Sequence, residues 1–160
     1  MSTTNTRETE IVSDPRVPLV RITREFDAPR EKVFRAHTDP ELVAQWLGPR
    51  RHQMRIDHYD CRTGGSYRYV MSSDGNEFGF HGCFHEVRAF ELIVQTFTFE
   101  GMPDGVALER VLLEDIGNGR TRLTATSLVD SFEARDAFVA SGMDSGVREG
   151  YERLDELLAG

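Results

Sequence analysis

Residues 143–158 read MDSGVREGYERLDELL. Their apolar members recur at intervals of three and four: Met143, Val147, Tyr151, Leu154 and Leu158. That spacing places these side chains on one face of a helix, which must be buried against another part of the chain. The sequence therefore predicts a long helix from about Ser141 to Leu158, packed on a layer formed by the preceding residues.

Three glycines form a second row beside this apolar stripe, at positions 142, 146 and 150. A glycine in a helix interior costs roughly 1 kcal/mol relative to alanine, so a compensating gain is expected. Two interpretations stay open. The missing side chains leave volume for a ligand under the helix, or they permit close packing against the sheet or another subunit.

The chain before this helix shows the patterns of strands that hairpin turns connect. Ser73-Asp74-Gly75-Asn76 and Gly117-Asn118-Gly119 are typical tight turns. The segments with strand character are 19–26, 54–60, 66–71, 77–87, 92–100, 106–114 and 121–128. Strands at hairpin spacing favour an antiparallel sheet over parallel crossovers.

Two short helices are expected after the first strand. Asp27 and Pro29 suit the start of the first one, and Asp39-Pro40 opens a second that ends at Trp46. A further helix over 132–140 precedes an interruption at Ser141-Gly142. The predicted fold is α+β, with a curved antiparallel sheet of six to seven strands wrapped around the last helix.

Composition limits the class of protein. The chain has 160 residues and a formal charge of −8, which argues against binding to a nucleic-acid backbone. We expect a flexible tail over residues 1–17 and a single domain over 18–160. The polar N-terminus and the lack of a long apolar run predict a cytoplasmic protein with no membrane partner. In that compartment Cys61 and Cys83 stay reduced.

Several short motifs resemble one protein family. They are Trp46-Leu47-Gly48-Pro49, Asp60-x-Arg62-x-Gly64-Gly65, Gly82-x-Phe84-x-Glu86-Val87, Gly119-x-Thr121-x-Leu123, Arg135-Asp136-Ala137 and Ser141-Gly142-Met143, with Gly146, Gly150 and Arg153-Leu154 downstream. Over about residues 18–158 the chain is similar to homologues of the heat-shock-protein 90 ATPase activator, within the START-like (SRPBCC) superfamily. The resemblance implies a helix-grip fold, with a cavity between the sheet and the long helix.

Such a cavity would hold a small apolar ligand, because binding pockets are mostly apolar with a few placed polar groups. The candidate lining residues are Trp46, Tyr69, Phe80, Phe84, Phe97, Phe99, Met143, Gly146, Val147, Gly150 and Tyr151. Each of them could equally be part of an ordinary packed core. Arg68, Glu109 and Arg110 are candidates for a polar anchor inside the cavity or for exposed positions on the sheet.

His81, Cys83 and His85 alternate along one predicted strand and would share one face. These residue types bind zinc or copper, but three positions on a straight strand rarely reach ligand geometry. They are weak metal candidates beside the simpler interpretation as solvent-facing residues. We expect neither a metal nor a cofactor.

No catalytic motif identifies a nucleophile. A cyclase or hydrolase would use the same cavity, with His81, Arg68 or Tyr151 as acid–base or orienting groups. An inward-facing His, Asp or Glu with a hydrogen-bonded partner would favour that alternative. A homodimer and a chaperone are further candidate partners, the chaperone on the strength of the resemblance alone.

Overall fold

In the computed structural model, which describes residues 8–160, eight strands form one antiparallel sheet in the order β1-β2-β8-β7-β6-β5-β4-β3. The strands are β1 (Glu10–Ser13), β2 (Leu19–Phe26), β3 (Gln53–Tyr59), β4 (Ser66–Ser73), β5 (Asn76–Arg88), β6 (Leu92–Phe99), β7 (Ala107–Gly117) and β8 (Arg120–Leu128). The helices are α1 (Arg30–Thr38), α2 (Pro40–Trp46), α3 (Phe132–Ala140) and α4 (Met143–Ala159).

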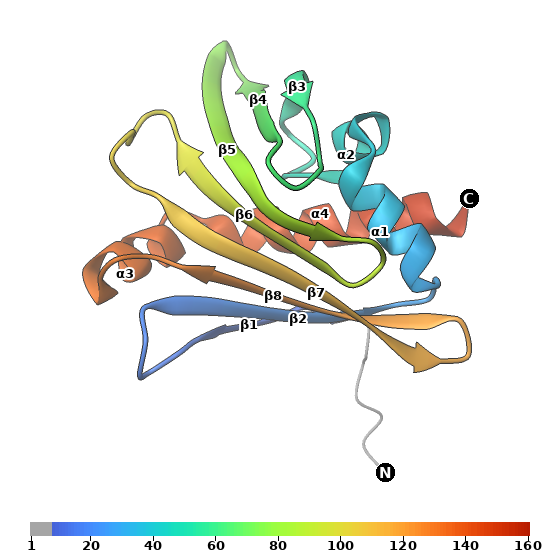
Figure 1. The fold of residues 1–160 in the computed structure, drawn as a ribbon. Helices are drawn as coiled ribbons and strands as arrows, with labels where there is room; N and C mark the ends of the chain where they lie inside the picture. The colour runs from blue at the N-terminus through green and yellow to red at the C-terminus, as the bar shows by residue number, and fades with distance from the viewer. Residues whose placement is uncertain (1–7) are drawn as a thin grey trace.

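Successive hairpins build the sheet from β3 to β8, and β2 then pairs with β8. Asp74 and Gly75 both have positive φ, as do Asn118 and Gly119, so the two predicted tight turns are confirmed. Register shifts interrupt the β3–β4, β5–β6 and β7–β8 ladders. Such irregularities bend strands, and they accompany the curvature of the sheet in Figure 1.

The long helix α4 runs across one face of the sheet, with α1 and α2 near its C-terminal half and α3 at its start (Figure 1). Tyr151, Leu154 and Leu158 are buried against a core that includes Phe26 of β2 and Leu123 of β8. Gly142 has φ +92° and separates α3 from α4, which confirms the predicted interruption. The arrangement is the helix-grip fold.

Two expectations need correction. Glu10–Ser13 forms β1, antiparallel to β2, so the unstructured tail predicted for residues 1–17 is wrong over this segment and the strand count is eight. The segment lacks strand alternation and is held by backbone pairing and by Arg148, whose guanidinium donates to the Thr9 carbonyl over 2.5 Å. Residues 1–7 lie outside the described part of the chain.

The expected cap of the first helix is also different. Pro29 occupies the N-cap position of α1, and the Asp27 carboxylate instead accepts a hydrogen bond from Arg120 over 2.7 Å. Asp39 caps α2 as expected, because its side chain accepts from the Glu41 amide.

Candidate functional site

The face of the sheet that α4 covers carries two aromatic clusters. The first contains Trp46 and Tyr151, with Met143 and Val147 packed against it. The second is centred on β4 and β5; it contains Tyr67, Tyr69 and Phe84, with Phe80 and Phe97 packed against it. Val111 touches both clusters and so joins them across β7.

Most of the predicted lining residues therefore share the covered face. Phe99 belongs to it as well, since its ring lies 5.4 Å from that of Phe80. Phe80, Phe97, Met143 and Val147 are only partly buried there. Strand alternation thus predicted correctly that Phe80 and Phe84 share one face of β5 and that Phe97 and Phe99 share one face of β6.

Trp46 has a mainly structural environment. Its indole nitrogen donates to the Ala36 carbonyl over 2.8 Å, and its ring stacks on Tyr151 at 5.9 Å. His37 meets the same ring edge-on at 4.9 Å. These contacts fix α1, α2 and α4 to one another.

The missing side chain at Gly150 does not open a space under α4. A Cβ at Gly150 would lie 3.3 Å from the Trp46 carbonyl oxygen and 3.4 Å from the Gly48 nitrogen. A Cβ at Gly146 would meet only Pro49, at 3.6 Å. The ligand-volume interpretation is therefore wrong at Gly150, where the missing side chain lets the loop after α2 approach the helix.

Glu109 is the acidic group on the covered face of β7. It lies directly opposite Gln95 of β6 and Ser127 of β8. Gln95 Nε2 donates to Glu109 Oε1 over 3.3 Å and to the Tyr67 hydroxyl over 3.3 Å. The Tyr67 hydroxyl in turn donates to the Thr96 carbonyl over 2.6 Å, so a hydrogen-bonded chain crosses the sheet from β4 to β7.

Burial raises the pKa of Glu109 to about 7, although the nearby Ser127 hydroxyl and Gln95 amide act in the opposite direction. The carboxyl group is enclosed by protein, yet the residue keeps some solvent-accessible surface. Ser127 Oγ is itself buried and makes no hydrogen bond of good geometry within residues 8–160.

Tyrosines from both clusters are close enough to Glu109 to feel its charge. Burial raises the pKa of Tyr67, Tyr69 and Tyr151, and the negative charge of Glu109 raises each of them further. Among the described residues, the Tyr69 and Tyr151 hydroxyls have no hydrogen-bond partner, and neither oxygen is fully enclosed. Glu109 therefore interacts with tyrosines of both aromatic clusters, two of whose hydroxyls have no hydrogen-bond partner among the described residues.

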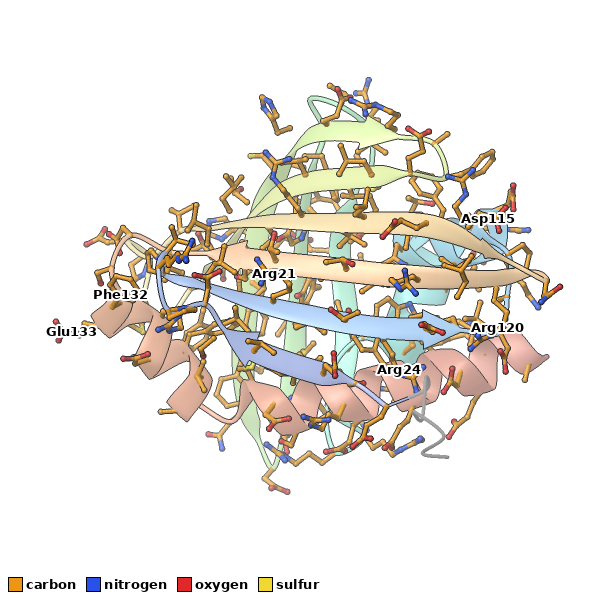
Figure 2. All side chains as sticks on the ribbon, turned by 90° about the horizontal axis from the view of Figure 1, so that it is seen from below. Arg21, Arg24, Asp115, Arg120, Phe132 and Glu133 are labelled. Carbon is orange, nitrogen blue, oxygen red and sulfur yellow. The ribbon has the colours of Figure 1, made fainter. Side chains whose placement is uncertain are left out.

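Arg24 is the buried cation at the edge of this region, on β2 beside α4 (Figure 2). Its guanidinium forms two hydrogen bonds with the Asp155 carboxylate, at 2.9 and 2.6 Å. It also lies over the Phe26 ring at 4.7 Å. The charge of Arg24 is thus already neutralised by α4.

The opposite face carries the other predicted polar candidates. Arg68 donates twice to Glu100, at 2.9 Å each, and His81 Nδ1 lies 2.8 Å from the same carboxylate. These contacts, above all the pair with Arg68, lower the pKa of Glu100 to about 2. Arg110 is exposed, so Glu109 alone of the three anchor candidates faces inward.

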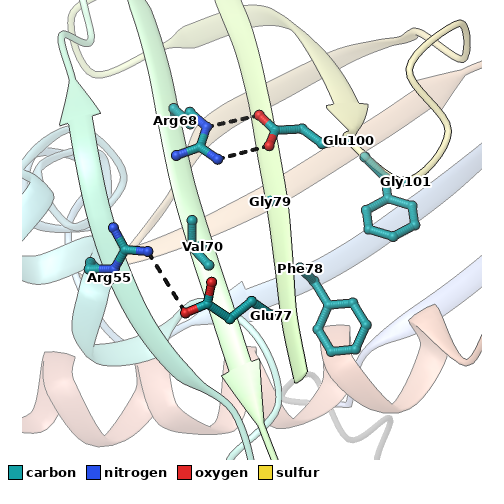
Figure 3. Close-up of a pocket in the computed structure, with 9 residues that line it drawn as sticks. Arg55, Arg68, Val70, Glu77, Phe78, Gly79, Glu100 and Gly101 are labelled. Atoms are coloured by element: carbon teal, nitrogen blue, oxygen red, sulfur yellow. Dashed lines mark hydrogen bonds and ion pairs between the residues drawn. The ribbon is translucent and has the colours of Figure 1, made fainter. Parts of the chain in front are cut away.

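A shallow depression of about 330 Å³ lies beside this ion pair on the outer face (Figure 3). Arg55 and Glu77 form a second, looser ion pair at 4.0 Å on its rim. Its charged groups are thus paired with one another.

The weak metal hypothesis fails on geometry. Cys83 and His85 are exposed, and His81 is bonded to Glu100. Across residues 8–160, no three His, Cys, Asp or Glu side chains come together as a metal would require. In the same range, no helix is long and apolar enough to cross a membrane.

Sequence reasoning missed Gln95 and kept Glu109 only as one of three equal candidates. The available signal was the alternation itself. Gln95 stands between the inward residues Ile93 and Phe97, and Glu109 stands between Ala107 and Val111. A polar residue at an inward position of each neighbouring strand predicts a buried polar pair.

Comparison with solved structures gives close matches of fold. A protein from Arthrobacter aurescens is 27% identical with a TM-score of 0.86, over 94% of this chain and 91% of that one. A Rhodobacter sphaeroides protein is 28% identical with a TM-score of 0.83, over 94% and 97%. Protein Ms6760 from Mycobacterium smegmatis, at 24% identity, shares the fold with a TM-score of 0.85, over 94% and 96%.

A comparison with curated proteins gave no match. The model of one protein family, described as Activator of Hsp90 ATPase homolog 1-like protein, matches residues 27–159. That range runs from the end of β2 to the end of α4 and includes both strands of the Gln95–Glu109 pair. The chain therefore belongs to the Activator of Hsp90 ATPase homolog 1-like family.

Proposed function

We propose that this protein binds a small, largely apolar molecule between the covered face of the sheet and the N-terminal half of α4. The observation that carries the proposal is the hydrogen-bonded pair of Gln95 and Glu109, which lies on the covered face of the sheet and keeps some solvent-accessible surface. A buried acid without a compensating charge is unfavourable, so a fold that needed only a core would have an apolar residue there.

The surrounding side chains support the same site. Phe80 and Phe97 stack at 5.4 Å and remain partly exposed although they point toward the covered side. Val147 and Met143 of α4 are also only partly buried. Apolar walls with a few placed polar groups are what small-molecule sites provide.

Native mass spectrometry of the protein purified from its own host tests the proposal directly. We expect an additional mass of a few hundred daltons that disappears on denaturation. As a second measurement, a fluorescent apolar dye should bind with one-to-one stoichiometry and be displaced by that ligand. A protein that carries no ligand and binds no dye at high micromolar concentration would contradict the proposal.

An acid–base enzyme of the cyclase or hydrolase type is the second candidate, and Glu109 favours it. The carboxyl group faces inward, has a hydrogen-bonded partner in Gln95, and has a pKa near 7, where a group can both give and take protons. His81 and Arg68 do not serve this role, because they lie on the outer face. Turnover of a bound ligand that Glu109→Gln abolishes without loss of binding would establish this activity.

A chaperone-interacting role would use a different surface. Leu108 and Leu128 face each other across β7 and β8 on the outer side and are both exposed. We expect an Hsp90-type partner, if it binds, to be lost with Leu108→Asp and Leu128→Asp and unaffected by Glu109→Gln. That pattern separates a protein-binding function from a ligand-binding one.

A further inference from the structure

We infer that the ligand of this site carries a basic nitrogen, and that Glu109 selects it by pairing its carboxylate with the ligand's ammonium group. The inference rests on the proposed ligand-binding function, and it adds the chemical class of the ligand and the residue that recognises it.

The Glu109 carboxylate lacks a counter-charge within the described chain. Within the described chain, Glu109 forms no ion pair, and its hydrogen-bond partner Gln95 is neutral and distant at 3.3 Å. Arg24 of β2, a buried cation on the same face, is already paired with Asp155 through two hydrogen bonds, although its Nε is buried without a partner in the described part of the chain. A carboxylate held in low dielectric without a cation is unfavourable, and a bound ammonium group would compensate it.

Three tyrosine rings near Glu109 would also favour a cation. Tyr67 and Tyr69 of β4 stack at 5.9 Å, and these two rings and Tyr151 of α4 lie within electrostatic range of the Glu109 carboxyl. The faces of aromatic rings attract cations, and a free phenolic oxygen accepts a hydrogen bond from N–H. Among described residues, the hydroxyls of Tyr69 and Tyr151 have no protein partner and are available for this contact.

Ligands that are anionic or neutral fit the Glu109 site less well than amines do. An anionic ligand would be repelled by Glu109, and the inward-facing cation Arg24 is already in an ion pair with Asp155. A neutral ligand that accepts a hydrogen bond would need Glu109 in its protonated form. The affinity for amines should therefore rise with pH, and the affinity for ligands that only accept a hydrogen bond should fall.

One group dominates that pH dependence. The groups close enough to Glu109 to interact with it electrostatically or by hydrogen bonding are Tyr59 of β3, Tyr67 and Tyr69 of β4, Gln95 of β6, Ser127 of β8 and Tyr151 of α4. The pKa of each tyrosine is raised, so all four stay neutral. His37, whose ring packs against Trp46, has a pKa that burial lowers, which favours its neutral form.

The test is a matched series of probes with one skeleton: 4-phenylbutylamine, 4-phenylbutan-1-ol and 4-phenylbutanoate. Binding is measured by calorimetry at pH 5.5 and 8.5, where the amine is cationic throughout. Since only the ionised fraction of Glu109 is competent, we expect the amine's affinity to rise by roughly thirty-fold between the two pH values. The alcohol can accept from the protonated carboxyl group or donate to the ionised one, so its affinity should change much less with pH, and the carboxylate should bind weakest of all.

Glu109→Gln should remove the preference for the amine over the alcohol and abolish the pH dependence, while the alcohol still binds. Glu114→Gln is the matched control, because Glu114 lies on the same strand but is exposed on the outer face. If Glu109→Gln does not fold, the pH dependence in the unmodified protein decides the question.

The outcomes separate the two proposals. Equal binding of amine and alcohol, or an amine affinity that does not rise with pH, overturns this inference and leaves the ligand site standing. Failure of all three probes to bind at millimolar concentration overturns the inference together with the proposed function.

Discussion

Gln95 and Glu109 face each other across β6 and β7, and the amide of one donates to the carboxyl of the other over 3.3 Å. The same amide donates to Tyr67, whose own proton goes to the Thr96 carbonyl. Because the direction of each donor is fixed by the next group, Gln95 can present only its N–H to Glu109. This row of hydrogen bonds thus holds the Glu109 carboxyl group in place without neutralising its charge.

Stability should fall as pH rises between about 4.5 and 7. The folded state raises the pKa of Glu109 from 4.5 to about 7, so in this range the folded chain binds a proton that the unfolded chain has released. At about 1.4 kcal/mol per pKa unit, the loss is on the order of 3 kcal/mol and is complete above pH 7. Glu109→Gln should be the more stable protein at pH 8 and equal to the unmodified protein near pH 4.5.

Urea denaturation of both proteins at pH 4.5, 6 and 8 measures this difference. Glu114→Gln, which changes an exposed side chain of the same strand, should follow the unmodified protein at every pH. Parallel pH profiles for the unmodified protein and Glu109→Gln would contradict the assignment of the buried charge.

Gln95→Leu should raise the pKa of Glu109 further. The substitution removes a donor that favours the ionised carboxyl and leaves burial unopposed except by Ser127. A carbon-detected NMR titration of the Glu109 carboxyl should show a midpoint clearly above that of the unmodified protein. A midpoint that moves down would mean that water enters and replaces the lost donor.

Gly146→Ala and Gly150→Ala form a pair that tests the role of the glycine row. Alanine at 146 meets only Pro49 at an ordinary contact distance, so the gain in helix propensity of roughly 1 kcal/mol should be kept. Alanine at 150 presses against the backbone of Trp46 and Gly48, and it should lose most or all of that gain. Thermal unfolding of the two variants checks the order, and ligand binding should be unchanged in Gly146→Ala.

The fold was largely predictable from local patterns. Turns that need positive φ, at Asp74-Gly75 and Asn118-Gly119, stand where the sequence places them, and the apolar spacing of α4 is visible in its residues. The strand β1 was not predictable, because pairing with β2 is a tertiary interaction and Glu10–Ser13 carries no alternation of its own.

The site was predictable only in part. Strand alternation identifies which aromatic residues share a face, and it places Glu109 and Arg110 on opposite sides. Alternation does not show which side of the sheet α4 covers, so from sequence alone Arg68 and His81 are candidates for the covered side. In the structure both pair with Glu100 on the outer face. The close approach at Gly150 involves the backbone of Trp46 and Gly48, which is distant in sequence, so no local pattern predicts it.

Ala125→Leu distinguishes an open site from a solid core. Ala125 lies on the covered side of β8, opposite Val111 of β7 and Ile22 of β2, and is only partly buried. If space exists under α4, the added carbons occupy it, and each buried methylene contributes about 0.8 kcal/mol. We then expect unchanged or increased stability together with at least a tenfold loss of ligand affinity. If the region is fully packed, the larger side chain should instead destabilise the protein by about 1–3 kcal/mol.

Thr126→Leu is the control, because Thr126 lies on the outer side of the same strand. It should leave ligand binding unchanged. A loss of affinity seen in Ala125→Leu alone therefore reports on the space between β8 and α4.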